Sequence, residues 1–203
     1  MFTPPLPEAV RVQREQQLGE ARAAAQAHPD DIEALVWLGR RTAYLGGYRE
    51  AVAIYTRALE RHPGEPRLLR HRGHRYLTLR RLDLAAADLE RAAALVRGKS
   101  DEVEPDGLPN AHSVPTSTLQ SNVWYHLGLA RYLQGDFPAA LAAYRECERA
   151  SANADMRVAT WHDARAVRAH PRVSTAPVTG VRLAAERKNS QVASTIAASR
   201  RMR

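Results

Sequence analysis

The sequence lacks the features that mark disulfide-rich, secreted or membrane proteins. It has a single cysteine, Cys147, so no disulfide can form within the chain and no oxidising compartment is implied. No run of about 18 apolar residues occurs, and the proline-rich start, residues 1–7, does not resemble a secretory signal. We therefore expect a soluble, cytoplasmic protein without a membrane span, which would be exported only if a signal is missing upstream of Met1.

Residues 1–157 also lack the excess of basic charge that a nucleic-acid-binding domain would have. The formal net charge of the chain is +8. Residues 158–203 contribute +7 of this charge, whereas residues 1–157 are nearly neutral at +1. The body therefore has no basic stripe that could release counterions from phosphates, and nucleic acid is expected to bind only through the basic end.

The sequence does contain an internal repeat. Gly39 recurs as Gly73 and Ala51 as Ala85, each after 34 residues. A third copy contains Gly128, which follows Gly73 by 55 residues, so an insertion of 21 residues separates the second and third copies. Such a period is typical of stacked pairs of helices.

Small and large residues are placed in the copies as two packed antiparallel helices require. Two helices approach closely only where one of them presents Gly or Ala, and large apolar side chains then fill the space beside that contact. Pro63 follows the second helix of the first copy, where its missing N–H does no harm. The anchors are Leu35, Leu38, Gly39, Tyr48, Ala51, Tyr55 and Ala58 in the first copy, and Trp124, Leu127, Gly128, Phe137, Ala140, Tyr144 and Cys147 in the third.

These anchors resemble the tetratricopeptide-repeat (TPR) pattern. The second copy departs from this pattern at Arg72, where an apolar residue is usual. The resemblance implies an all-α fold: an α-solenoid of about three helix-turn-helix repeats, with an N-terminal capping helix and an irregular C-terminal tail. The array, residues 1–162, is divided into a half-repeat at 8–29, repeats at 32–65, 66–99 and 121–154, an insertion loop at 100–120 and an incomplete fourth repeat from 155. The period predicts helices at 8–27, 33–51, 50–62, 66–79, 83–97, 121–134 and 138–151.

The insertion at residues 100–120 is rich in proline and acidic residues and has no periodicity, which predicts a loop. The loop is either a tolerated surface insertion or a functional segment. Together with the third copy, its sequence resembles a group of bacterial TPR proteins without an assigned role, whose members often carry an export signal upstream.

The repeat pattern ends abruptly near residue 163. His162 replaces a small residue, and Pro171 and Pro177 would break the second helix of a fourth repeat. Residues 163–203 are basic and poor in large apolar residues, so we predict a disordered tail whose deletion leaves the melting transition unchanged. Two explanations are open. The tail is a natural extension, or it is translated in a shifted frame of a GC-rich gene, as the scarcity of lysine relative to arginine suggests.

The first helices of the repeats are expected to line a partner-binding groove, because the resemblance places their residues on the concave side of the array. These positions combine aromatic rings with Arg and His, which suits an acidic peptide in an extended or helical form. A solvated face with partly buried rings is the alternative. The family's clamp for C-terminal carboxylates is not supported, because Val36 and Arg40 stand where it needs Lys and Asn. The predicted groove consists of Arg40, Tyr44, Arg67, Arg70, His74, Asn122, Tyr125 and Tyr132.

Residue patterns typical of an enzyme do not occur. His71, His74 and His126 fall on neighbouring repeats, but no Cys or carboxylate in register completes a metal site. No nucleophile elbow, phosphate loop or metalloprotease motif is present. We therefore predict no catalytic residue, metal or cofactor, and a protein–protein interaction scaffold that binds a partner protein or peptide. The alternative is an RNA- or anion-binding protein that uses the basic tail.

Overall fold

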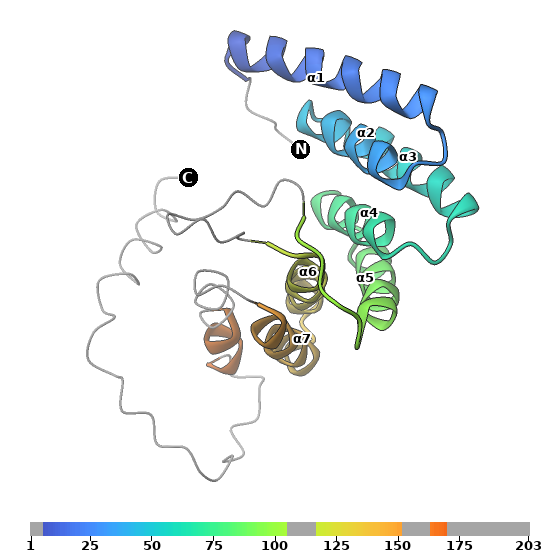
Figure 1. The fold of residues 1–203 in the computed structure, drawn as a ribbon. Helices are drawn as coiled ribbons and strands as arrows, with labels where there is room; N and C mark the ends of the chain where they lie inside the picture. Colours follow the sequence, from blue (N-terminus) through green and yellow to red (C-terminus); the bar gives the residue numbers. More distant parts are fainter. Residues whose placement is uncertain (1–5, 105–116, 152–162, 170–203) are drawn as a thin grey trace, which may run out of the picture. The chain divides into compact units, whose positions relative to one another are not determined.

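The computed structural model describes residues 6–104, 117–151 and 163–169 of the chain. This part is built from helices (Figure 1). Its one isolated β-bridge joins Val103 to Thr118. None of the described helices is long and apolar enough to cross a membrane. The helices are α1 (Glu8–Ala27), α2 (Ile32–Tyr44), α3 (Tyr48–Arg61), α4 (Pro66–Thr78), α5 (Leu82–Val96), α6 (Leu119–Gln134) and α7 (Phe137–Ala150).

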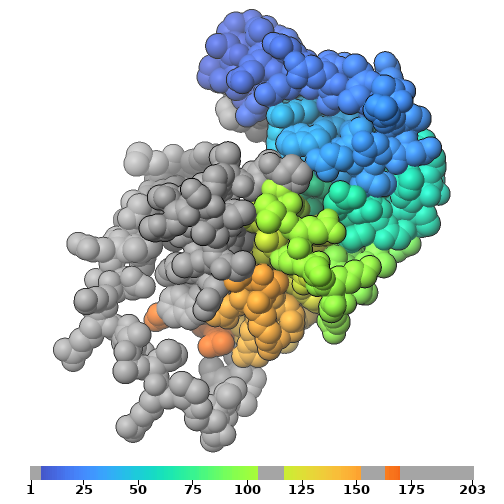
Figure 2. Space-filling view, viewed as in Figure 1, coloured from blue at the N-terminus to red at the C-terminus, as the bar shows by residue number. Residues whose placement is uncertain are grey.

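The helices pack in sequence order, each against the next, as the colours of Figures 1 and 2 show. Among the first helices of the repeats, α4 also contacts both α2 and α6, whereas in the described part of the chain α3, α5 and α7 do not contact one another. The first helices therefore form one tight layer and the second helices a more open one. This confirms the predicted all-α fold of stacked helix pairs, because the layering follows the repeat.

Side-chain caps fix where several helices begin. Asp31 accepts a hydrogen bond from the backbone N–H of Glu33 at 2.8 Å at the start of α2. Glu65 does the same for Arg67 at 3.0 Å before α4. Both caps satisfy an amide that has no partner inside its own helix. Thr118 and Ser121 of α6 form a reciprocal capping box.

The helix predicted at 33–51 is wrong in its C-terminal bound, because α2 ends at Tyr44. Gly46 has a φ of +87°, a conformation that glycine adopts without steric cost. The chain turns there, and α3 begins at Tyr48. The helix predicted at 8–27 coincides with α1.

The small residues of the repeat lie where the pattern requires them. A Cβ atom added to Gly128 would lie 2.6 Å from the ring of Tyr144, and one added to Gly73 would lie 2.8 Å from Cγ of Leu89. Real Cβ atoms do not approach other atoms so closely. The two helices of each repeat can therefore pack at this distance only with glycine at the contact.

Arg72, the departure from the TPR pattern, is paired across the two helices of its repeat. Its Nε donates to Oδ2 of Asp88 on α5 at 2.7 Å, and a second guanidinium nitrogen donates to Oδ1 at 2.8 Å. The two side chains are only 17% and 10% exposed. A two-point ion pair thus replaces the usual apolar contact at this position.

The segment 163–168 is a short helix, which corrects the prediction of an irregular tail beginning at Asp163. Ala164 and Val167 are buried, and they pack with Phe137 and Tyr144 of α7. Two apolar residues at helical spacing were enough to bury one face of a helix against the array. Residues 170–203, which make up the rest of the predicted tail, lie outside the described residues.

Candidate partner-binding face

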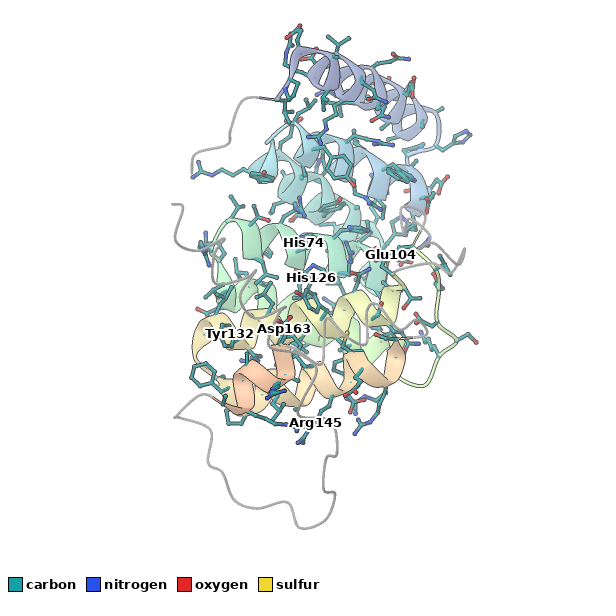
Figure 3. All side chains as sticks on the ribbon, turned by 90° about the vertical axis from the view of Figure 1, so that its left-hand side faces the viewer. His74, Glu104, His126, Tyr132, Arg145 and Asp163 are labelled. Carbon is teal, nitrogen blue, oxygen red and sulfur yellow. The ribbon has the colours of Figure 1, made fainter. Side chains whose placement is uncertain are left out.

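The eight predicted groove residues lie on the layer of first helices, here called the first-helix face. Figure 3 looks onto this face, with His74 and His126 near its centre. Arg40, Arg70 and Asn122 are buried, and Tyr132 is 37% exposed. The remaining members are half-buried, namely Tyr44, Arg67, His74 and Tyr125. The face is therefore a partly buried polar layer and not a fully solvated surface.

On α2, arginine side chains stack on aromatic rings. The guanidinium of Arg40 lies 4.6 Å from the centre of the Trp37 ring. Arg40 also donates a hydrogen bond to the hydroxyl of Tyr44 at 2.8 Å. A stacked guanidinium of this kind keeps its charge while its flat faces are removed from water. These contacts set Arg40 and Tyr44 as one rigid unit.

Arg67, at the start of α4, is held by acids of the array. Its Nε donates to Glu65 at 3.0 Å, and a terminal nitrogen lies 3.6 Å from a carboxylate oxygen of Glu33 on α2. This predicted groove residue joins two repeats, so less of its charge is available to a partner.

Arg70 binds a carboxylate that the sequence did not lead us to expect at this site. One of its terminal nitrogens donates to Oε2 of Glu104 at 2.8 Å, and both residues are only 7% exposed. Glu104 belongs to the insertion (Figure 3). The acidic composition of the insertion, set against a basic first-helix face, was the only signal in the sequence that pointed to this pair.

The described ends of the insertion are ordered, although the sequence predicts a loop over 100–120. The backbone N–H of Leu119 donates to the carbonyl of Glu102 at 2.7 Å, and that of Glu104 donates to Ser117 at 3.3 Å. The N–H of Gln120 donates to a carboxylate oxygen of Asp101 at 3.0 Å. The segment 101–104 therefore runs extended beside the start of α6, while residues 105–116 lie outside the described part.

Three histidines adjoin Arg70 on this face: His71 and His126 are buried and His74 is half-buried. Because arginine can only donate, Nδ1 of His71 accepts from Arg70 and Nδ1 of His74 accepts from Arg75, both at 2.8 Å. The rings of His74 and His126 lie 4.3 Å apart. Burial lowers the pKa of each histidine well below its usual range, to about 3 for His126, and the nearby arginine charges lower it further. The histidines are therefore neutral at pH 7.

Among the described residues, no group of three or more His, Cys, Asp or Glu side chains could hold a metal ion. His126 donates from Nδ1 to the backbone carbonyl of Asn122 at 2.6 Å. This hydrogen bond satisfies a polar atom of the buried ring. The histidines thus act in packing and hydrogen bonding.

The two tyrosines of α6 have different roles. The hydroxyl of Tyr125 hydrogen-bonds to the carboxylate of Asp163, and burial raises the pKa of Tyr125 to about 12. Tyr125 therefore holds the C-terminal helix on the array. Tyr132 packs edge-on against Phe137 at 5.6 Å between ring centres and remains partly exposed. Arg70 and Arg40 thus act on Glu104 of the insertion, whereas Tyr125 contacts Asp163 of the C-terminal helix.

Buried arginine side chains dominate the electrostatics of the first-helix face. Burial lowers the pKa of Arg70 and of Arg75, and the charge of Arg40 lowers both further. Glu104 supplies the opposing charge, but its own pKa is raised, first by burial. The loss of hydration therefore offsets much of the attraction between Arg70 and Glu104.

Solved structures identify this arrangement as the TPR fold. The TPR protein TTC0263 of Thermus thermophilus superimposes with a TM-score of 0.58 at 19% identity, over 77% of this chain and 75% of that one. The Sgt2 TPR domain of Aspergillus fumigatus gives 0.51 at 24% identity, over 76% and 91%. The first TPR of Spaghetti (RPAP3), bound to the HSP90 peptide SRMEEVD, gives 0.50 at 20% identity, over 66% and 90%. No family model matches the sequence, and no curated protein matches it either.

Proposed function

We propose that this chain is a non-catalytic scaffold that binds a partner protein or peptide on its first-helix face. The observation that carries this proposal is the contact between Arg70 and Glu104. Buried on the first-helix layer, Arg70 donates to a carboxylate that is presented by an extended piece of chain. A face that holds one extended acidic segment has the chemistry to hold another.

The surroundings of Arg70 support recognition of a peptide. Arg40 is fixed by Trp37 and Tyr44, so its position is set before a partner arrives. The TPR of Spaghetti (RPAP3) binds SRMEEVD, a peptide with several acidic residues. By analogy of fold, a basic layer of first helices suits an acidic ligand here.

Affinity capture with purified protein tests the proposal. Arg70→Glu reverses the charge at the carboxylate contact, and Arg57→Glu makes the same change at an exposed position of α3. We expect a partner to be retained by the wild type and by Arg57→Glu and lost with Arg70→Glu. Circular dichroism should show equal helicity for all three proteins. Equal retention by both variants would place the binding surface elsewhere, and a wild-type protein that retains nothing would contradict the proposal.

A further inference from the structure

The segment 101–104 lies on the first-helix face as a bound peptide would. It pairs with the residues before α6 through the bridge between Val103 and Thr118. Successive side chains of an extended segment point in opposite directions. Val103 is accordingly 56% exposed and Glu104 only 7% exposed, so one carboxylate is directed inward against Arg70.

This internal ligand satisfies its site incompletely. Nε of Arg70 and Oε1 of Glu104 are both buried, and neither has a hydrogen-bond partner among the described residues. A guanidinium and a carboxylate can form two parallel hydrogen bonds, but this pair forms one. A carboxylate that approached Arg70 from a better angle would accept a second hydrogen bond, from Nε as well as from the terminal nitrogen.

The charges around the pair favour an acidic occupant of this site. Arg40 and Arg75 act on Arg70 as like charges, and Glu104 is the acid that opposes them. Removal of Glu104 would therefore leave the positive charges of Arg40, Arg70 and Arg75 without this opposing carboxylate. Because burial also weakens the existing pair, its displacement by a partner costs less than the close contact suggests.

We propose that the segment 101–104 is a built-in competitor, in which Glu104 occupies on Arg70 the position of a carboxylate from an extended acidic partner peptide. This inference rests on the proposed function. The partner binds the fraction of molecules in which Glu104 has left Arg70, so its apparent affinity is reduced by that fraction. The insertion thereby sets a threshold that only a strongly acidic partner, or one at high concentration, overcomes.

Fluorescence anisotropy with a labelled peptide tests the inference in the full chain. The probe is the chain's own sequence from Lys99 to Glu104 with an amidated C-terminus. Glu104→Gln removes the competing charge and should bind the probe about tenfold more tightly than the wild type. The matched control is Glu102→Gln, which makes the same charge change at an exposed side chain of the same segment and should bind as the wild type does.

A second variant loosens the segment without altering Glu104. Asp101→Ala removes the carboxylate that accepts from the N–H of Gln120, and it should raise the affinity for the probe to a smaller extent than Glu104→Gln. Arg70→Gln placed in the Glu104→Gln background should abolish the gain, because the carboxylate of the probe loses its donor. Melting curves show whether each variant is folded.

The results separate this inference from the proposed function. If Glu104→Gln binds the probe no more tightly than the wild type and Arg70→Gln still abolishes binding, competition is disproved while peptide binding stands. If no variant binds the probe, the competitor is disproved, and affinity capture with Arg70→Glu decides the proposed function separately. A higher affinity in Glu102→Gln equal to that in Glu104→Gln would indicate a general charge effect and overturn the inference.

Discussion

At the scale of single residues, the glycines of the repeat set how closely its helices can pack. We predict that Gly128→Ala destabilises the protein by about 2 kcal/mol, because the added Cβ would overlap the ring of Tyr144. Gly64→Ala is the control, since a Cβ there meets nothing within 4 Å. Urea unfolding measures both changes. Tyr144→Leu in the Gly128→Ala background should recover part of the loss, and equal stability of the two alanine variants would contradict the packing argument.

The buried histidines should make the protein sensitive to acid. The pKa of His126 is about 3 in the folded chain and near its usual 6.5 in the unfolded chain. Between these values only the unfolded chain binds the proton, so the free energy of unfolding falls as the pH drops below 6.5. The slope is about 1.4 kcal/mol per pH unit for each such histidine.

The measurement is the free energy of unfolding in urea at pH 7.5 and at pH 5.0. His126→Gln should reduce the difference between the two pH values, because one protonation site of the unfolded chain is removed. His28→Gln, at an exposed position, is the comparison variant and should change the difference less. An unchanged difference in His126→Gln would show that this histidine does not carry the pH dependence.

At the scale of elements, the pair between α4 and α5 replaces the apolar contact that the repeat normally makes. We predict that Asp88→Asn costs about 2 kcal/mol of stability, because it leaves the half-buried guanidinium of Arg72 without its counter-charge. The double variant Arg72→Leu, Asp88→Leu should be close to the wild type, since it restores the apolar contact. Thermal unfolding tests this pair of outcomes, with Glu60→Gln on the exposed face of α3 as control. A double variant less stable than Asp88→Asn would refute the replacement argument.

At the scale of the whole molecule, the sequence predicts the elements that follow the repeat period and does not predict the contacts of non-periodic segments. Gly39, Gly73 and Gly128 recur in register, and this periodicity was sufficient to predict the helix pairs and their layering. The position of Glu104 was not predictable, because a non-periodic segment carries no sign of which helix it will contact. The burial of Arg40, Arg70 and Asn122 was not predicted either, since a repeat position gives the direction of a side chain and not what covers it.

The start of the C-terminal segment shows the same limit. The scarcity of large apolar residues after Asp163 predicted that nothing there would pack, yet Val167 is only 1% exposed. A short helix needs few apolar residues when the end of the array already offers Phe137 and Tyr144 as a surface. The reading-frame explanation of the tail stays a prediction, which the nucleotide sequence of the gene can test.

Two truncations of the whole chain separate the packed helix from the basic tail. A chain ending at residue 169 keeps the helix 163–168 and should melt at the temperature of the full chain. A chain ending at residue 162 loses the burial of Val167 and the hydrogen bond between Asp163 and Tyr125. We predict that it melts about 5 °C lower, because these contacts contribute about 2 kcal/mol.

Point variants decide whether packing is the cause. Val167→Asp should lower the melting temperature about as much as the shorter truncation does, because it places a charge against Phe137 and Tyr144. Ala166→Asp makes a similar change at an exposed position of the same helix and should have little effect. If the chain ending at residue 162 melts like the full chain, the C-terminal helix does not stabilise the array, and the original prediction of a tail that can be removed without loss would hold from residue 163 onward.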